Sequence, residues 1–137
     1  MKLITYNALN TRTTSTLPAI TFSKYNHITI SQAAVDFMQI KNGDYILFHQ
    51  DAASRKDWYI EKDDKKEGIR VKVYRYKTGV EQVKFSNKVL VRELYRSLGI
   101  PVQTKRFEII KKNLGGRELF QIVTSGNAVN RPVSDLY

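Results

Sequence analysis

Residues 26–48 read NHITISQAAVDFMQIKNGDYILF, and this stretch decides the expected fold. Its opening residues alternate polar and apolar side chains, which is typical of a half-buried strand, and Ser31 then fits a helix N-cap. Apolar residues recur after it at helical spacing until a Lys-Asn-Gly-Asp turn. Together with the next apolar run, the stretch predicts a βαββ unit over about 26–62. Its elements are a strand at 27–30, a helix at 31–38, a strand at 45–48 and a strand at 58–60.

The same order of elements recurs over about 81–124. Ser86 follows a strand as Ser31 does, and a longer amphipathic helix then ends at Gly99, a good C-cap. Phe48 and Trp58 in the first unit have the same spacing as Ile110 and Phe120 in the second. The second unit is predicted to contain a strand at 83–85, a helix at 87–98, a strand at 107–110 and a strand at 119–123. A duplicated unit predicts a pseudo-two-fold domain.

The remaining segments are expected to be strands, turns and a tail. They are a weak edge strand at 2–8, a loop at 10–17, a strand at 19–22, a charged hinge at 61–68, a half-exposed strand at 69–74 and a loosely ordered tail at 125–137. The predicted fold is therefore a single α+β, mostly β domain spanning 1–137. Two tandem βαββ repeats would form its pseudo-symmetric barrel, with an extra strand region at the N-terminus.

Composition narrows the classes of protein to consider. A hydrophobic content of 42% argues against disorder, and the chain has no cysteine for disulfides or thiolate zinc sites. No run of apolar residues is long enough for a membrane-spanning helix, and the first residues do not resemble a secretory signal. We therefore expect a cytoplasmic protein without a membrane partner.

The formal net charge of +10 favours an anionic partner, and its distribution is uneven. The first unit carries four basic against five acidic residues, whereas the second carries nine against four. The linking segment 63–80 carries a further excess of basic residues. A nucleic-acid surface should therefore lie on the second unit and on the segment before it.

Two patterns supply the candidate nucleic-acid contacts. Lys88, Arg92 and Arg96 recur every four residues along one helix face, where a row of cations would attract phosphates. Tyr74 and Tyr76 alternate with basic residues in the preceding strand, which would suit both phosphate contact and base stacking. Solvated helix and sheet faces are the plainer interpretation of both patterns. The candidates are Arg70, Lys72, Arg75, Lys77, Lys84, Lys88, Arg92 and Arg96.

The first unit resembles the swapped-hairpin AbrB/MazE-like family. The match centres on residues 28–31 and on residues 37–48, where a helix, a Gly-Asp turn and a strand follow one another. The second unit echoes it at 97–100 but has Pro101 where the Gly-Asp turn would stand. Two copies in one chain are similar to the tandem, MraZ-type members of the family. This resemblance implies interleaved hairpins in one barrel, either as a monomer with internal pseudo-symmetry or as a homodimer.

The resemblance also implies DNA binding through basic residues before the first strand and around the helix. By position, these are Lys24, Tyr25, Asn26 and His27 in the first unit. In the second they are Arg75, Lys77, Lys84, Lys88, Arg92 and Arg96. Ser31 stands where the family prefers proline. The first set is weak for DNA, and the second is adequate.

The sequence therefore predicts a non-enzymatic nucleic-acid-binding protein, with double-stranded DNA favoured. An alternative is an adaptor that binds a protein partner through the duplicated scaffold, with Tyr25, Trp58 and Tyr59 as candidate exposed aromatic residues. Core and cross-strand packing is the plainer interpretation of Phe48, Trp58 and Tyr59. An RNA or single-strand binder that uses Tyr74 and Tyr76 stays open. His27 and His49 do not show metal-ligand spacing, and no catalytic or nucleotide-binding motif is present. We expect no catalytic residues, no metal and no cofactor.

Overall fold

The structure, a computed structural model, describes residues 17–124. The predicted strand at 2–8, most of the predicted loop at 10–17 and the predicted tail at 125–137 lie outside the described residues. The elements are β1 (Ala19–Phe22), β2 (His27–Ile30), α1 (Gln32–Met38), β3 (Tyr45–Gln50), β4 (Trp58–Asp63), β5 (Ile69–Arg70), β6 (Val73–Arg75), β7 (Glu81–Ser86), α2 (Lys88–Leu98), β8 (Lys105–Leu114) and β9 (Arg117–Ile122).

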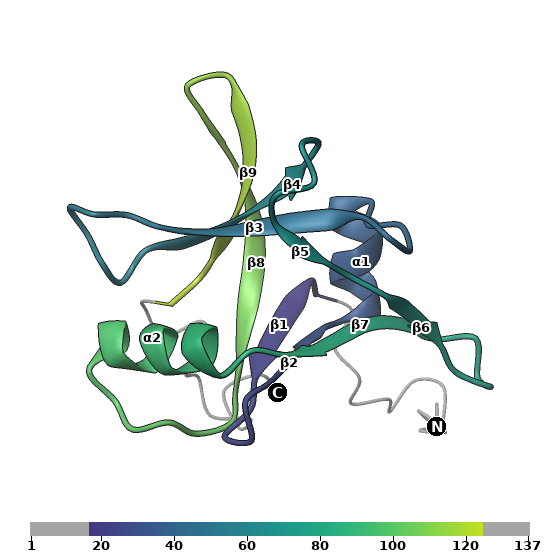
Figure 1. Ribbon diagram of the computed structural model, residues 1–137, viewed down its shortest axis with the longest axis horizontal. Coiled ribbons are helices and arrows are strands. Elements are labelled where there is room, and N and C mark those ends of the chain that lie inside the picture. The colour runs from purple at the N-terminus through teal and green to yellow at the C-terminus, as the bar shows by residue number, and fades with distance from the viewer. Residues whose placement is uncertain (1–16, 125–137) are drawn as a thin grey trace, which may run out of the picture.

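The strands form a single nine-stranded sheet in the order β5-β3-β4-β9-β8-β1-β2-β7-β6, and its strand pairs are antiparallel. The sheet curls into half of a barrel, with the two helices beside it (Figure 1). This confirms the predicted α+β, mostly β class. Neither helix in the range 17–124 is long and apolar enough to cross a membrane.

The two edges of this sheet belong to one short piece of chain. β5 pairs with β3 and β6 pairs with β7, and only Val71 and Lys72 separate β5 from β6. Val71 is buried, and its N–H donates to the Asp44 carbonyl oxygen at 2.8 Å, while its own carbonyl accepts from Gly43 at 2.9 Å. Segment 69–75 therefore connects both edges of the curled sheet. The predicted alternation of buried and exposed side chains along it is confirmed.

The first helix forms as the sequence predicts. The Ser31 hydroxyl accepts a hydrogen bond from the Ala34 amide at 3.2 Å, which satisfies one of the unpaired donors of the first turn. Ala34, Val35 and Met38 face the core. The helix ends at Gln39, which adopts a left-handed conformation with φ of 56°.

The second helix forms over almost the whole of the predicted range. Asn87 is the N-cap, and its side-chain oxygen accepts from the Leu90 amide at 3.0 Å. Ser86 instead ends β7 with an exposed side chain, because a strand residue before the cap alternates outward. The C-terminal prediction is confirmed, since Gly99 has a φ of 69° and caps the last carbonyls.

The charged hinge predicted at 61–68 is shorter than expected, because β4 continues through Asp63. The Asp63 carboxylate accepts hydrogen bonds from the amides of Lys65, Glu67 and Gly68 at 2.8, 2.7 and 2.5 Å. Partial burial opposes ionisation, but these three bonds outweigh it and lower the pKa of Asp63. The carboxylate thus organises the turn between β4 and β5.

The core lies inside the curl of the sheet and receives side chains from nearly every strand and both helices. Phe22 of β1 and Phe107 of β8 meet edge to face with their ring centroids 5.9 Å apart. Tyr95 of α2 is fully buried beside them, and its hydroxyl donates to the Phe22 carbonyl oxygen at 2.6 Å. Burial raises the pKa of Tyr95 to about 12, so this donor stays protonated at neutral pH. The sequence did not single out Tyr95.

Replacing Tyr95 with phenylalanine tests how firmly this bond holds α2 to β1. The substitution keeps the ring but leaves a buried carbonyl without its partner, so Tyr95→Phe should lower the free energy of unfolding by about 1–3 kcal/mol. Urea unfolding followed by circular dichroism measures the change. Tyr25→Phe is the matched control, because Tyr25 is 68% exposed and should leave stability unchanged. Equal stability of both variants would contradict this role of Tyr95.

An ionic cluster joins the hairpin β3–β4 to the hairpin β8–β9. Arg117 donates to both carboxylate oxygens of Glu61, at 3.0 and 2.5 Å, and His49 lies 3.0 Å from the same carboxylate. The bond from Arg117 is the main cause of a lowered pKa at Glu61, with a smaller contribution from His49. The side chain of Glu61 is 18% exposed and that of Arg117 is 58% exposed, so the cluster lies at the surface with its carboxylate partly shielded from solvent.

The lowered pKa of Glu61 makes a prediction about acid stability. A carboxyl group whose pKa is lower in the folded than in the unfolded protein stabilises the fold above its unfolded pKa, about 4.3. This stabilisation is lost as the pH falls through the folded pKa. Glu61→Gln should therefore cost about 1–2 kcal/mol at pH 7 and progressively less below pH about 4. Denaturant unfolding across pH 3–7 measures this, with Glu118→Gln on the exposed Lys111 pair as the control. A pH-independent cost would show that packing dominates.

Candidate nucleic-acid interface

The eight predicted contact residues are all exposed, so each is available to an anionic partner. They come from three parts of the structure. Arg70, Lys72 and Arg75 belong to segment 69–75, Lys77 and Lys84 to the β6–β7 turn and β7, and Lys88, Arg92 and Arg96 to α2.

Two adjoining hollows lie along β6 and β7. Arg70, Lys72 and Lys84 line the first, of about 420 Å³, together with Tyr74. Lys84 and Tyr74 also line the second, of about 470 Å³, whose other residues are mostly polar. They are Ser23, His27, Thr29, Phe85 and Ser86. Lys84 and the 45%-exposed ring of Tyr74 thus lie between two concave surfaces, one basic and one rich in hydroxyl groups.

Strand pairing aligns basic and hydroxyl side chains across the sheet. Lys84 of β7 pairs with Thr29 of β2, Thr29 with Thr21 of β1, and Thr21 with Arg106 of β8. Directly opposite residues of antiparallel strands project from the same face, so these four side chains form one row. Lys72 extends it, because Val73 pairs with Val83 and the preceding residue emerges on the same side as Lys84. We call Lys72, Lys84, Thr29, Thr21 and Arg106 the basic row.

Arg106 was not among the predicted contacts. It lies in β8, between buried Phe107 and partly buried Lys105, and its guanidinium donates to the Leu17 carbonyl at 3.3 Å. The alternation of β8 puts Arg106 outside, but only the pairing of β8 with β1 brings it into line with Lys84. The local sequence predicts the exposure, whereas the position in the row depends on a contact distant in sequence.

The predicted residues differ in whether a carboxylate lies within ion-pair distance of their charged group. Arg75 lies 3.5 Å from Glu81 and Arg96 lies 3.4 Å from Glu93, so both have a carboxylate neighbour. Within residues 17–124, no carboxylate lies within ion-pair distance of Arg70, Lys72 or Lys84. The cations that line the hollow therefore keep their full charge for an external anion.

The basic stripe of α2 forms a separate group. Lys88, Arg92 and Arg96 are exposed along one side of the helix, as their spacing predicts, but none of them lines either hollow. β7 enters α2 through Asn87, so Lys84 and Lys88 flank this junction. The structure thus places the predicted contacts in two neighbouring groups rather than in one cluster.

The residues before β2, which the family resemblance points to, form a small polar corner. The Lys24 ammonium lies 5.2 Å from the ring centroid of Tyr25, a cation–π contact. His27 Nδ1 and Ser86 Oγ are 2.8 Å apart across the β2–β7 pair. His27 and Ser86 line the second hollow, which places them beside Lys84.

Trp58 is only 4% exposed, which confirms its interpretation as a core residue and removes it from the surface of the adaptor alternative. Its indole Nε1 donates to the Ser97 hydroxyl at 2.9 Å, so both its ring and its polar atom are used inside the structure. Tyr59 is half-buried, and Tyr25 is exposed. The alternation of β4 places Trp58 and Ile60 inward. The sequence shows this alternation, but by itself it does not show which of the two faces of the strand is buried.

Metal chemistry finds no support in the part of the chain that the structure describes. No group of three or more histidine, aspartate or glutamate side chains in that range could hold a metal ion. The arrangement described above offers cations, hydroxyl groups and one aromatic ring, which suits phosphate binding.

Comparison with known proteins adds no identification. No protein-family model matches this chain, and comparisons with curated proteins and with solved structures found no match.

Proposed function

We propose that this protein binds nucleic acid without acting as an enzyme, and that double-stranded DNA is its preferred partner. The observation that carries the proposal is the hollow in which Arg70, Lys72 and Lys84 converge without a neighbouring carboxylate. Each phosphate that such a group neutralises releases a condensed counterion, which drives binding and makes it salt-dependent. The hydroxyl groups of Thr21 and Thr29 in the basic row can add hydrogen bonds to phosphate oxygens.

The length of the basic row favours a duplex. From Arg106 to Lys84 it crosses three inter-strand steps, and neighbouring strands lie about 4.8 Å apart. The part of the row from Arg106 to Lys84 therefore spans about 14 Å along the sheet, which is close to the major-groove width of about 12 Å. Cations at its two ends can thus contact the backbones on either side of one groove. A single strand would instead favour Tyr74, whose exposed ring could stack on a base.

We also propose that the chain folds as two interleaved copies of one unit, similar to the tandem swapped-hairpin architecture. β2 pairs with β7 and β4 pairs with β9, so corresponding strands of the two segments lie next to each other. Tyr59 pairs with Gln121, and these two residues occupy the same position in the two segments by the spacing of Phe48 and Ile110.

Contacts of the helices support the interleaving. Phe37 of α1 packs edge to face on Phe120 of β9, with ring centroids 5.5 Å apart. Ser97 of α2 accepts the hydrogen bond of Trp58, which belongs to β4. Each helix therefore contacts the last strand of the other segment. Segment 69–75 occupies the place that β1 holds in the first half, since each pairs with the strand that follows it and with a strand of the other half.

Neutralising the hollow tests the nucleic-acid proposal. Lys72→Ala with Lys84→Ala should weaken duplex binding and reduce the slope of log K against log salt by about 1.8, or about 0.9 per lost phosphate contact. Fluorescence anisotropy with a labelled duplex at several salt concentrations measures both effects. Arg55→Ala with Lys56→Ala is the control, because it removes the same charge from the β3–β4 loop, away from β6 and β7 (Figure 1).

Two comparisons make this experiment decisive. Lys88→Ala with Arg92→Ala tells whether the helix stripe shares the contact, and matched single-stranded DNA and RNA test the duplex preference. Equal losses in the hollow variant and the loop control would show only an effect of net charge. Preferential binding of single strands would transfer the role to Tyr74 and Tyr76.

Splitting the chain tests the interleaved architecture. If the hairpins are exchanged, residues 1–64 and 65–137 should each fail to unfold cooperatively when alone, because the pairs β1–β8, β2–β7 and β4–β9 would be missing. Mixing the two pieces should restore a cooperative thermal transition, monitored by near-ultraviolet circular dichroism. A stable, cooperative fold of either piece alone would rule the interleaving out.

A further inference from the structure

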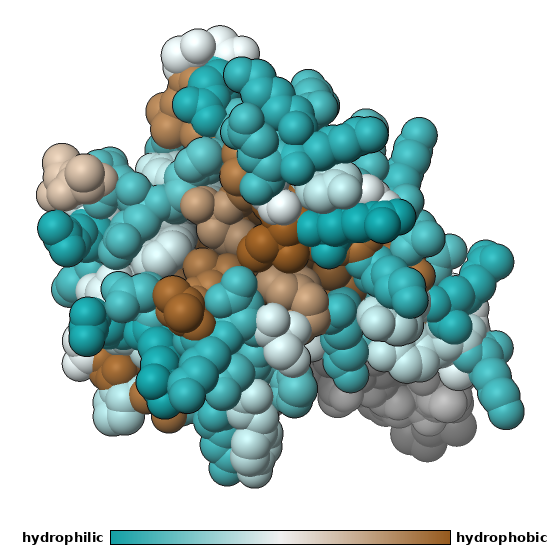
Figure 2. Space-filling model, viewed as in Figure 1, coloured by the Kyte–Doolittle hydropathy of each residue, from teal (hydrophilic) through white to brown (hydrophobic). Residues whose placement is uncertain are grey.

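A third surface, unrelated to the basic row, lies between β3 and α2. It is an open groove of about 690 Å³ that includes side chains of Phe48, Trp58, Ile69 and Leu90. The space-filling view shows apolar residues gathered in the middle of this face among polar ones (Figure 2). Val89, in the first turn of α2, is 72% exposed at this groove. Val89 therefore extends the apolar lining of the groove onto the surface of the protein.

The groove also runs along a strand edge that has no neighbour among the described residues. β3 extends from Tyr45 to Gln50, but β5 pairs with it only at Tyr45 and Ile46. Gly68 then approaches so closely that an added Cβ would lie 2.2 Å from the Ile46 carbonyl oxygen, and the chain turns away there. The second half of β3 is therefore paired with β4 alone.

The direction of the free main-chain groups follows from the pairing pattern. The Asp44 carbonyl accepts from Val71, so the main chain of residue 44 faces β5. In an antiparallel sheet every second residue directs its N–H and C=O to the same side. Phe48 and Gln50 therefore present their N–H and C=O groups to the open edge. An extended segment could add to this edge as a strand, a common mode of peptide recognition.

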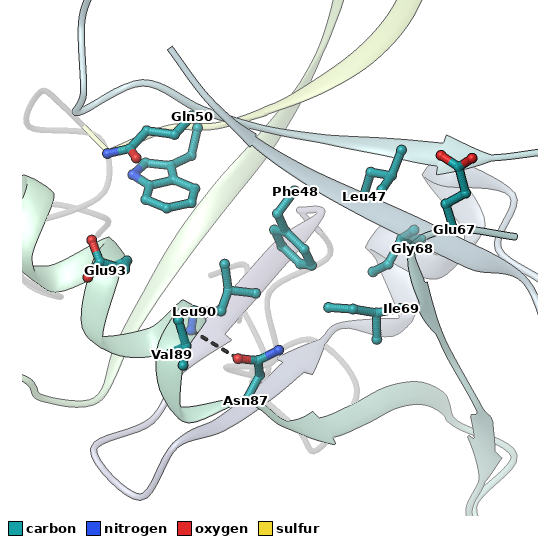
Figure 3. Close-up of a pocket in the computed structure, with 12 residues that line it drawn as sticks. Leu47, Phe48, Gln50, Glu67, Gly68, Ile69, Asn87, Val89, Leu90 and Glu93 are labelled. Carbon is teal, nitrogen blue, oxygen red and sulfur yellow. Dashed lines mark hydrogen bonds between the residues drawn. The ribbon is translucent and has the colours of Figure 1, made fainter. Parts of the chain in front are cut away.

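The charged side chains at the groove indicate which kind of extended segment would bind there. Glu67 and Glu93 lie at opposite ends of the groove, with Phe48, Leu90 and Ile69 between them (Figure 3). Among the described residues no basic side chain lines the groove, although Glu93 also lies 3.4 Å from Arg96 of the same helix. The complementary occupant has apolar side chains in its centre and a basic side chain at each end.

The two helices differ in the part that builds the groove. α2 has eleven residues and α1 has seven, and both are capped by a left-handed residue at their C-terminal end. When the two helices are aligned at these C-terminal caps, the first turn of α2 has no counterpart in the shorter α1. That turn contributes Val89 and Leu90, and Asn87 caps it. The groove is thus a property of the second helix rather than of the sheet alone.

We infer that this groove binds an extended protein segment of basic–apolar–basic pattern, which adds as a strand to β3 at residues 47–50. Main-chain hydrogen bonds to Phe48 and Gln50 would hold its backbone, and an apolar side chain would occupy the space between Phe48 and Val89. Basic side chains at its ends would contact Glu67 and Glu93. This inference goes beyond nucleic-acid binding and does not depend on it.

The test uses the full chain and the synthetic peptide acetyl-Lys-Thr-Val-Thr-Leu-Thr-Arg-amide with a fluorescent label. Its alternate side chains give the required pattern on one face, and threonine supports an extended conformation. Fluorescence anisotropy should show saturable binding. Val89→Asp should weaken it by about tenfold or more, as loss of a central contact does. Aspartate is favourable near a helix N-terminus, so the fold should be kept.

Matched controls distinguish strand addition from non-specific binding of the peptide. Replacing the peptide's two basic residues with glutamate should abolish binding, and Glu67→Lys with Glu93→Lys in the protein should restore it. N-methylation of the valine or of the adjacent threonine amide should block binding in one case only, because successive amides point to opposite sides of a strand. Equal binding of the acidic peptide, or of both methylated peptides, would overturn the inference.

Other occupants give distinct results. A molecular mass by light scattering that doubles with concentration, and falls to that of the monomer in Val89→Asp, would assign the groove to a second copy of the chain and overturn the proposal. Peptide binding seen only after Leu136→Asp would assign it to the chain's own C-terminal residues, with the same consequence. No binding of the basic peptide to any form would also overturn it.

Discussion

The rest of this structure depends on one constraint, which is that segment 69–75 must pair with both edges of the sheet. β5 takes the edge beside β3 and β6 the edge beside β7, with buried Val71 between them. Two backbone hydrogen bonds join Val71 to residues 43 and 44, so the segment continues beside β3 past the end of β5. Gly68 makes this path accessible, since any side chain there would collide with the Ile46 carbonyl oxygen.

Both candidate surfaces follow from that constraint. The outward residues of the segment, Arg70 and Lys72, are brought to Lys84 because β6 pairs with β7. The inward-facing residues of the segment complete the core, so its polar side chains lie on the outer face of the sheet. The N-terminal end of segment 69–75 follows the turn that Asp63 organises. This turn leads the chain away from β3 beside Ile46, so the second half of β3 keeps an open edge. A basic hollow and an apolar groove therefore share one short segment.

Local patterns predicted most elements well, and the errors came from contacts distant in sequence. Ser31 and Gly99 mark helix ends through bonds within a few residues, so the sequence alone was sufficient there. Asn87, the first residue of the predicted helix, is the cap, because β7 continues through Ser86 in its pairing with His27 of β2. The exposure of the eight basic residues followed from alternation and helix spacing. Their division into two groups, and the place of Arg106, required the order of strands in the sheet.

The two surfaces differ in the physical forces that a partner would use, and this difference separates them experimentally. At the basic row the cations are exposed, so salt screens them and binding should fall steeply with ionic strength. In the groove, strand addition relies on main-chain hydrogen bonds and buried apolar area, which salt affects little, and only the two terminal carboxylates respond to it. If both proposals hold, a partner that stays bound at high salt is expected in the groove, and one that is released is expected at the row. Glu67 and Glu93 line the groove and no basic side chain within residues 17–124 does, so the groove itself offers phosphate no cation there, whereas the row offers several.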